Sequence, residues 1–195
     1  MAETDLVTVE LVPDVAPYED AIWSLLEIAD EEFVPPLSAR TGAKQRDGLD
    51  DRSGEDLSTF FEACLDHEFI IARKNDDVVG FLSFHDGYNI EELEGYLPSN
   101  YVSTVIVHPD HRRSGYARQL YEHLLGALPN GHRQPYVTTR TWGTNDSHIE
   151  LLEEFGFNCI ARIKNDRGPG IDTVYFGRET PPKATEETSS SDQTV

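Results

Sequence analysis

The sequence predicts a single domain with a mixed α/β fold. Its 195 residues are close to the size of one ordinary domain, and 38% of them are hydrophobic, which is enough for a buried core. Segments with the alternation of strands are interspersed with segments of helical spacing, in the order β-α-α-β-β-β-α-β-α-β-β. This order is typical of one mixed sheet with helices packed against it.

The N-terminal part of the chain predicts one strand and two helices. Residues 5–12 alternate polar with β-branched or apolar residues, as a strand does. In residues 16–33 the apolar positions recur at spacings of three and four, which predicts a helix with one buried face. Residues 34–53 have no period and are expected to form a loop. Ser53, with an acid three residues later, predicts the start of a second helix that buries Cys64.

The middle of the chain predicts three strands. Residues 68–73 and 78–84 are rich in apolar residues and are separated by Asn75-Asp76-Asp77, which suits a hairpin turn. Residues 86–100 are acidic and rich in turn formers, so they are expected to form a surface connection. Residues 102–107 form a nearly continuous β-branched run, which is typical of a strand buried on both faces.

The last third predicts two helices and three more strands. A helix is expected over 114–128, a strand over 136–142 and a short helix over 147–155. Residues 157–163 and 171–177 are expected to form a closing pair of strands.

The predicted domain spans residues 1–179. Residues 180–195 have almost no large apolar side chains and are expected to form a disordered acidic tail.

The chain is strongly acidic, with 36 Asp and Glu against 16 Lys and Arg and a formal net charge of −20. Such a charge disfavours binding to nucleic acid or to an anionic membrane surface. Lysine is scarce, with four residues against twelve arginines. An acid-rich, lysine-poor surface is typical of a protein that works in molar salt, because salt screens the repulsion between carboxylates. An ordinary acidic protein is the alternative interpretation.

The same composition predicts a cytoplasmic protein without a metal centre. No apolar run approaches the roughly 18 residues of a membrane span, and the first residues are acidic where a signal peptide is basic. Two cysteines, Cys64 and Cys159, can make neither a disulfide framework nor a metal site of their own. The composition leaves the oligomeric state open, and a homodimer is one candidate.

The segment that carries chemistry begins at the β-branched strand and continues into a helix through the turn 112–117. The first turn of a helix presents unpaired N–H groups and the positive end of the helix dipole, so it attracts anions. Gly115 has no side chain to keep a phosphate away, and Arg112, Arg113 and Arg118 add positive charge. The Gly-Lys-Ser/Thr ending of a triphosphate loop and the further glycines of a dinucleotide fold are missing, so another diphosphate ligand is expected.

Two sequence patterns resemble the GNAT superfamily of acetyl-CoA-dependent N-acetyltransferases. Val-x-Pro-x-x-Arg, ending at Arg112, and Arg-x-x-Gly-x-Ala, from Arg112 to Ala117, are similar to motif A of that family. The segment from Asn145 to Phe157 is similar to the family's Asn-x-x-Ala-x-x-Leu-Tyr-x-x-x-Gly-Phe. The resemblance covers roughly residues 5–178 and implies the GNAT fold, a mixed and mostly antiparallel sheet with helices on both faces.

The resemblance also implies acetyl-CoA as co-substrate and assigns the residues that hold it. The pantetheine arm would pair with backbone groups of one strand: Val105, Ile106 and Val107. The pyrophosphate would be held by successive backbone N–H groups: those of Arg113, Ser114, Gly115, Tyr116 and Ala117. Arg112 opens this motif and Arg118 lies nearby, while the Asn145 amide would contact the cofactor near its pantetheine end.

The implied reaction is direct attack of a neutral primary amine on the thioester, and two residues depart from the family pattern. Leu152 stands where many members carry a tyrosine that protonates the thiolate, and Arg140 stands where some carry a glutamate base. Tyr101 and Glu94 are weaker candidates for proton transfer. His148 replaces the usual alanine and is expected to have a surface role.

These departures leave a second function open. A non-catalytic acyl-CoA-binding module, acting as a sensor or as a partner subunit, would need neither proton-transfer residue. For the enzyme, the acceptor amine is likewise open between a small amine, an antibiotic, a protein N-terminus and a lysine.

Overall fold

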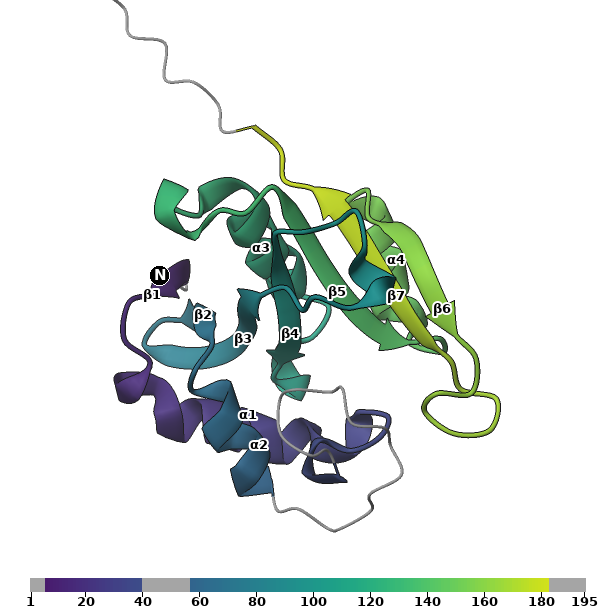
Figure 1. Ribbon diagram of the computed structural model, residues 1–195. Helices are drawn as coiled ribbons and strands as arrows, with labels where there is room; N and C mark the ends of the chain where they lie inside the picture. The colour runs from purple at the N-terminus through teal and green to yellow at the C-terminus, as the bar shows by residue number, and fades with distance from the viewer. Residues whose placement is uncertain (1–5, 40–56, 183–195) are drawn as a thin grey trace, which may run out of the picture.

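The computed structural model describes residues 6–39 and 57–182, and its centre is a seven-stranded sheet (Figure 1). The strand order is β1-β2-β3-β4-β5-β7-β6. Strands β4 and β5 run parallel, and the other neighbouring strands run antiparallel. The strands are β1 (Val7–Val12), β2 (Glu68–Lys74), β3 (Asp77–Asp86), β4 (Ser99–Val107), β5 (Tyr136–Trp142), β6 (Asn158–Ile163) and β7 (Thr173–Glu179).

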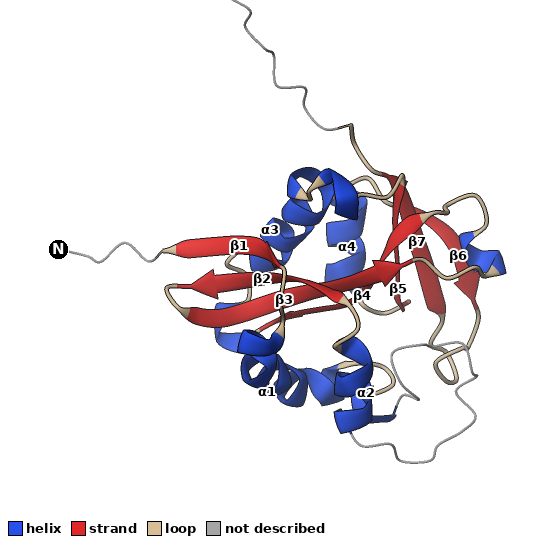
Figure 2. Ribbon diagram, turned by 60° about the vertical axis from the view of Figure 1, so that its left-hand side comes forward, coloured by secondary structure: helices blue, strands red, loops and turns tan. Residues whose placement is uncertain are grey.

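Helices cover both faces of the sheet (Figure 2). One face carries α1 (Glu19–Ala29) and α2 (Leu57–Cys64), and the other carries α3 (Tyr116–Glu122) and α4 (Asp146–Glu154). The mixed, mostly antiparallel sheet with helices on both faces confirms the predicted fold class. Among the described residues, no helix is both long and apolar enough to cross a lipid bilayer.

Each face of the sheet has its own hydrophobic cluster. The first packs α3 and α4 against the sheet and is centred on side chains that are almost fully buried, such as Tyr121 and Leu152. The second packs α1 and α2 against the opposite face and includes Cys64, at 1% exposure. The predicted burial of Cys64 is thus confirmed.

The two longest predicted helices are interrupted. The region predicted as one helix over 16–33 consists of a 3₁₀ turn, α1 and a second 3₁₀ turn at Asp30–Glu32. Three consecutive acids are unfavourable at the negative C-terminal end of a helix, which accounts for the break. After α3, the chain continues as a π-helix over His123–Ala127 rather than as a regular helix to residue 128.

Other predicted elements differ in burial or lie outside the description. The predicted surface connection 86–100 contains a 3₁₀ turn at Glu91–Leu93, and the Leu93 side chain is fully buried beneath it. The predicted cap Ser53 and most of the predicted tail 180–195 lie outside the described residues.

The parallel strands β4 and β5 stay together over only part of their length. Ser99–Val102 pair with Tyr136–Thr139, and the pairing then ends. In the β3–β4 register, Thr104 lies opposite Ser83 while Val102 lies opposite Phe84, so Ser103 is the extra residue of a β-bulge. Beyond this bulge the C-terminal half of β4 pairs with β3 along one edge. Its other edge does not pair with β5 and is called here the free edge of β4.

Candidate active site

The free edge of β4 presents the backbone groups of alternate residues. The amide of His108 donates to the Val79 carbonyl of β3 at 2.8 Å. A Cβ on Gly80 of β3 would lie 2.7 Å from the Ile106 carbonyl oxygen, so this carbonyl also faces β3. Because successive residues of a strand direct their N–H and C=O groups to opposite edges, Val105 and Val107 present theirs to the free edge. Of the three residues predicted to pair with a pantetheine arm, Ile106 does not share this orientation.

The turn after β4 leads directly to the start of α3. Gly115 is the N-cap of α3 and has a left-handed backbone with φ +82°. A Cβ there would meet no atom closer than the Gln119 amide nitrogen, at 4.0 Å, so the space in front of the turn is open. Arg113 also has a positive φ, of 60°, and both Arg113 and Ser114 are exposed. The backbone N–H groups of this turn therefore lie at an accessible helix N-terminus, as the sequence predicts.

Two of the three arginines near this turn are paired with acids. Arg112 Nη2 lies 2.6 Å from Glu32 Oε2, and Arg112 Nε donates to the Val107 carbonyl at 3.3 Å. Arg118 pairs with Glu154 of α4 and stacks on the Phe155 ring. Arg112 thus joins the free edge of β4 to the turn that follows α1, whereas Arg118 joins α3 to α4.

The remaining predicted cofactor residues lie close to this region. Tyr116 has its side chain in the core, and Ala117 is half-buried on the first turn of α3. Asn145 is the N-cap of α4, and its side-chain Nδ2 donates to Thr141 Oγ1 of β5 at 3.0 Å. The side-chain amide of Asn145 is therefore held against β5, on the opposite side of the opening between β4 and β5 from the free edge of β4.

A cluster of aromatic side chains lies where β4 and β5 are still paired. Tyr101 is 4% exposed and packs with Leu93 and Tyr175. Its ring centroid lies 5.0 Å from Tyr88 and 5.2 Å from His85. Burial raises the pKa of the Tyr101 hydroxyl well above its usual range, and burial raises that of Tyr88 to about 12. Tyr101 therefore keeps its proton at neutral pH and is poorly suited to act as a general base.

The two other positions considered for proton transfer, 94 and 152, lie in different surroundings. Glu94 is exposed on the 3₁₀ turn above the cluster. Leu152 is fully buried in the hydrophobic cluster beneath α3 and α4, where a tyrosine ring would overpack the core. The predicted absence of the usual tyrosine acid thus has a packing reason.

Arg140 occupies the place of the family's glutamate base and is held by Tyr175. Its Nη1 donates to the Tyr175 hydroxyl at 3.0 Å, and its guanidinium lies 5.7 Å from the centroid of that ring. Burial works against the charged form of Arg140, but Tyr101, Tyr175 and Asp166 outweigh it and raise the pKa of Arg140. A charged guanidinium therefore stands where some members of the family carry a glutamate base.

His148 differs from the prediction of a surface role. It is half-buried on α4, and its Nε2 lies 2.9 Å from the Tyr121 hydroxyl of α3. Burial lowers the pKa of His148 to about 4, so the ring is neutral at pH 7. The side chain faces α3, on the same face of the sheet as Leu152, and it joins the two helices.

Sequence reasoning missed several residues of this region. Arg167 comes from the loop between β6 and β7, and its Nε donates to Thr173 Oγ1 at 3.0 Å, next to Arg140 and Tyr175. His67 stacks on His85 with ring centroids 4.6 Å apart, and burial and His85 lower the pKa of His67 to about 4. These contacts depend on long-range strand pairing, so no local pattern could have revealed them.

His108, Asp110 and His111, whose side chains are of the kinds that bind metals, lie together in one turn. His108 Nδ1 accepts a hydrogen bond from the Asp110 amide at 3.2 Å, and His111 closes the same 3₁₀ turn. Within residues 6–39 and 57–182, no group of three or more His, Cys, Asp or Glu side chains is arranged to hold a metal ion.

Comparison with known proteins identifies the family. The profile described as "Acetyltransferase (GNAT) family" matches residues 22–157, which is more than half of the chain. A search of curated proteins finds no match.

Solved structures of the same fold extend over almost the whole chain. The chain is similar to YncA from Salmonella typhimurium, assigned as an acetyltransferase and solved with its cofactor acetyl-CoA, at 21% identity and TM-score 0.61; the match covers 94% of this chain and 99% of that one. It is also similar to the ribosomal-protein-S18-alanine N-acetyltransferase from Escherichia coli, at 15% identity, TM-score 0.61, and 93% and 98% coverage. NAA60 from Arabidopsis thaliana, solved with a bisubstrate analogue, matches at 16% identity, TM-score 0.63, and 88% and 98% coverage.

These identities show the fold, and the matched profile shows the family. The profile match over residues 22–157 shows that this chain belongs to the GNAT acetyltransferase family, a family of acyl-CoA-dependent N-acetyltransferases.

Proposed function

We propose that the chain binds acetyl-CoA in the opening between β4 and β5 and transfers the acetyl group to a primary amine by direct attack. The observation that carries this proposal is that β4–β5 pairing ends at Val102 and Thr139, which leaves a free edge on the part of β4 that leads to the Gly115 turn. Val105 and Val107 would pair with the pantetheine arm as an added strand would. The arm would thus pair with the free edge of β4, to which Val105 and Val107 direct their backbone N–H and C=O groups.

The pyrophosphate would lie at the start of α3. The open space in front of Gly115 supports this placement, as does the accessible N-terminus of the helix. The N–H groups assigned to it run from Arg113 to Ala117. Asn145, held by Thr141 at the other side of the opening, would contact the cofactor near its pantetheine end.

The chemical step needs positioning and a polarised carbonyl. Bound acetyl-CoA supplies a thioester, which is an activated acyl group. The Val107 N–H, or one beside it on the free edge, would donate to the thioester carbonyl oxygen and stabilise the negative charge that develops there. Holding the amine against the acetyl carbon supplies the rest of the acceleration.

The test combines a binding and a turnover measurement. Calorimetry measures the affinity of the protein for CoA, and release of free thiol from acetyl-CoA measures transfer to each member of a panel of amines. Tight CoA binding together with amine-dependent thiol release supports the proposal. Tight binding without turnover of any amine would instead favour the non-catalytic acyl-CoA-binding module.

We also propose the setting in which the protein works. Residues 1–179 would form the catalytic domain and residues 180–195 an appended acidic tail. The net charge of −20 and the scarcity of lysine support adaptation to high salt. The protein would act in the cytoplasm, where acetyl-CoA is supplied, as a monomer or as a homodimer.

A further inference from the structure

Residues 30–38, called here the bridging segment, are fixed to the end of β5. The ring centroid of Phe33 lies 5.7 Å from that of Trp142, the last residue of β5. The Val34 carbonyl accepts a hydrogen bond from Arg167 Nη1 at 2.5 Å, and the Arg167 guanidinium lies 6.0 Å from the centroid of the same Trp142 ring. The β5 side of the bridging segment is thus held by an aromatic contact and a hydrogen bond.

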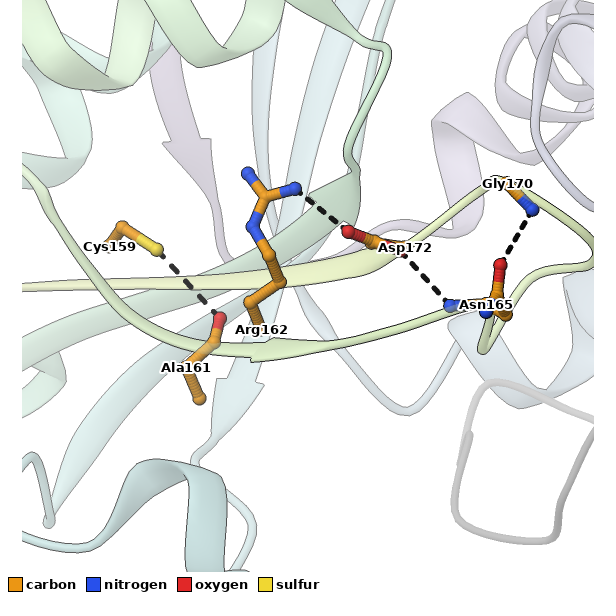
Figure 3. Close-up of polar contacts among 6 residues, drawn as sticks. All are labelled: Cys159, Ala161, Arg162, Asn165, Gly170 and Asp172. Atoms are coloured by element: carbon orange, nitrogen blue, oxygen red, sulfur yellow. Dashed lines mark hydrogen bonds and ion pairs between the residues drawn. The ribbon is translucent and has the colours of Figure 1, made fainter.

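The loop that carries Arg167 is itself held by hydrogen bonds. The Asn165 amide donates to Asp172 Oδ1 at 3.0 Å, and the Asn165 side chain accepts from the Gly170 amide at 2.7 Å (Figure 3). Arg167 Nε donates to Thr173 Oγ1 of β7 at 3.0 Å. The bridging segment is therefore anchored on this side to a loop that is fixed by its own contacts.

On the β4 side, the bridging segment is joined by an ion pair at the surface. Glu32 Oε2 lies 2.6 Å from Arg112 Nη2, and these side chains are 48% and 43% exposed. Arg112 Nε in turn donates to the carbonyl of Val107, the last residue of β4, at 3.3 Å. Ion pairs this exposed contribute little free energy, so a competing anion can replace one partner. The β4 side is therefore the side that a ligand can change more easily.

Arg112 lies beside both parts of the proposed cofactor site. It directly precedes the turn 113–117, whose N–H groups are assigned to the pyrophosphate. The Val107 carbonyl that it contacts lies on the free edge of β4, where the pantetheine arm would pair. A guanidinium binds phosphate through paired, charge-assisted hydrogen bonds, and a pyrophosphate carries more negative charge than one carboxylate. A pyrophosphate bound at this turn would therefore attract Arg112 away from Glu32.

We propose that Glu32 is a positioning residue of the cofactor site, which competes with the pyrophosphate of acetyl-CoA for Arg112. With Glu32 as its partner, the guanidinium lies against the Val107 carbonyl. With the pyrophosphate as its partner, it leaves this carbonyl to the pantetheine arm and releases the β4 side of the bridging segment. The inference rests on the proposed function, because it uses the cofactor position proposed there.

The experiment measures CoA affinity by calorimetry in variants of two neighbouring acids. Glu32→Gln should raise the affinity about two- to fivefold above that of Glu31→Gln, because Arg112 then has no competing carboxylate. Glu31→Gln is the matched control, since Glu31 is exposed in the same 3₁₀ turn and its substitution changes the net charge by the same amount. Any gain in Glu31→Gln measures the general effect of net charge on an anionic ligand.

Two further comparisons assign the gain to Arg112 and to the pyrophosphate. Arg112→Gln should itself weaken CoA binding, and in its background Glu32→Gln should have no more effect than Glu31→Gln, because the shared partner is gone. With Arg112 present, the gain from Glu32→Gln should persist with dephospho-CoA, which keeps the pyrophosphate, and disappear with pantetheine, which lacks it. A merely structural effect of Glu32 would not depend on the pyrophosphate.

Equal CoA affinities of Glu32→Gln and Glu31→Gln would overturn the inference. A gain that persists with pantetheine, or in the Arg112→Gln background, would overturn it as well, and each of these results leaves the proposed function standing. CoA binding without amine-dependent thiol release would contradict the proposed transfer, while the comparison of variants still decides the role of Glu32. Absence of CoA binding by the wild-type protein would contradict both. Circular dichroism of each variant shows whether its fold is intact.

Discussion

At the residue scale, Gly115 is the position in the proposed cofactor site where the backbone conformation and the space for a ligand most restrict the side chain. Its φ of +82° is a conformation that β-branched residues almost never adopt, and the space before it is where a phosphate would lie. Gly115→Val should therefore weaken CoA binding by about tenfold or more, or about 1.4 kcal/mol, because its side chain would fill the open space where the pyrophosphate would lie. Calorimetry with CoA measures the change.

A second glycine provides the control for this substitution. Gly126, in the π-helix, has no positive φ, and a Cβ there would meet no atom within 4 Å. Gly126→Val should leave CoA affinity unchanged, although it can alter stability. Equal affinities for wild type and Gly115→Val would contradict the proposed phosphate turn.

Tyr101 tests whether a hydroxyl carries the proton. Burial raises its pKa well above the usual range, so it does not ionise between pH 6 and 10. We expect Tyr101→Phe to keep kcat within about threefold of wild type over this range, since general acid–base catalysis contributes at least about a hundredfold where it operates. The measurement is the pH profile of thiol release. A loss of tenfold or more in kcat would place the Tyr101 hydroxyl in the proton path.

How far the site was predictable depends on the range of the interactions involved. The Gly115 turn follows from a local pattern, because a strand, a glycine and a helix start are adjacent in sequence. Arg140 was visible as a departure from the family pattern, but its partner Tyr175 is 35 residues away on a strand whose neighbour no local pattern gives. Arg167 was missed for the same reason.

At the element scale, His148 joins α4 to α3 through the Tyr121 hydroxyl, and its pKa is lowered to about 4 by burial. The unfolded chain binds a proton near pH 6.5, whereas the folded protein does not until about pH 4. The free energy of unfolding should therefore fall as the pH drops below 6.5 and level off near 4. Each pH unit in this window corresponds to at most about 1.4 kcal/mol for one such histidine.

His148→Gln keeps a polar partner for Tyr121 and removes the titration. The loss of stability between pH 6.5 and 5, measured by urea unfolding in 2 M KCl, should be smaller in this variant by about 1–2 kcal/mol. Tyr121→Phe is the control, because it removes the hydrogen bond and keeps the histidine, so the pH-dependent loss should persist. An unchanged loss in His148→Gln would show that His148 titrates normally in the folded protein.

Elements whose bounds are set by their own local sequence were predicted well, in contrast to features that depend on contacts with other elements. The strand 136–142 matches β5 in both bounds, because every residue of it except Arg140 is β-branched or aromatic. The break after α1 and the π-helix after α3 were not predicted, since apolar spacing continues through both. The β4 bulge at Ser103, which places Tyr101 and Thr104 on one face, depends on the partner strand and leaves no trace in the sequence pattern.

At the scale of the whole molecule, the charge is the property most open to test. With a net charge of −20, mutual repulsion of carboxylates opposes the compact state in dilute buffer. The screening length falls from about 10 Å at 0.1 M salt to about 3 Å at 1 M. If the surface is adapted to salt, the thermal midpoint at pH 7 should rise steeply between dilute buffer and molar KCl. Thermal unfolding followed by circular dichroism gives the midpoint at each concentration.

The effect of pH separates screening from other effects of KCl. The sequence pI is about 4.5, so at that pH the net repulsion is small and salt has little to screen. The rise of the midpoint with KCl should therefore be much smaller at pH 4.5 than at pH 7. A rise of the same size at both pH values would assign it to a general effect of salt on burial, which does not depend on net charge. No rise at pH 7 would mean that the acidic surface is of the ordinary kind and that the fold tolerates its own charge without salt.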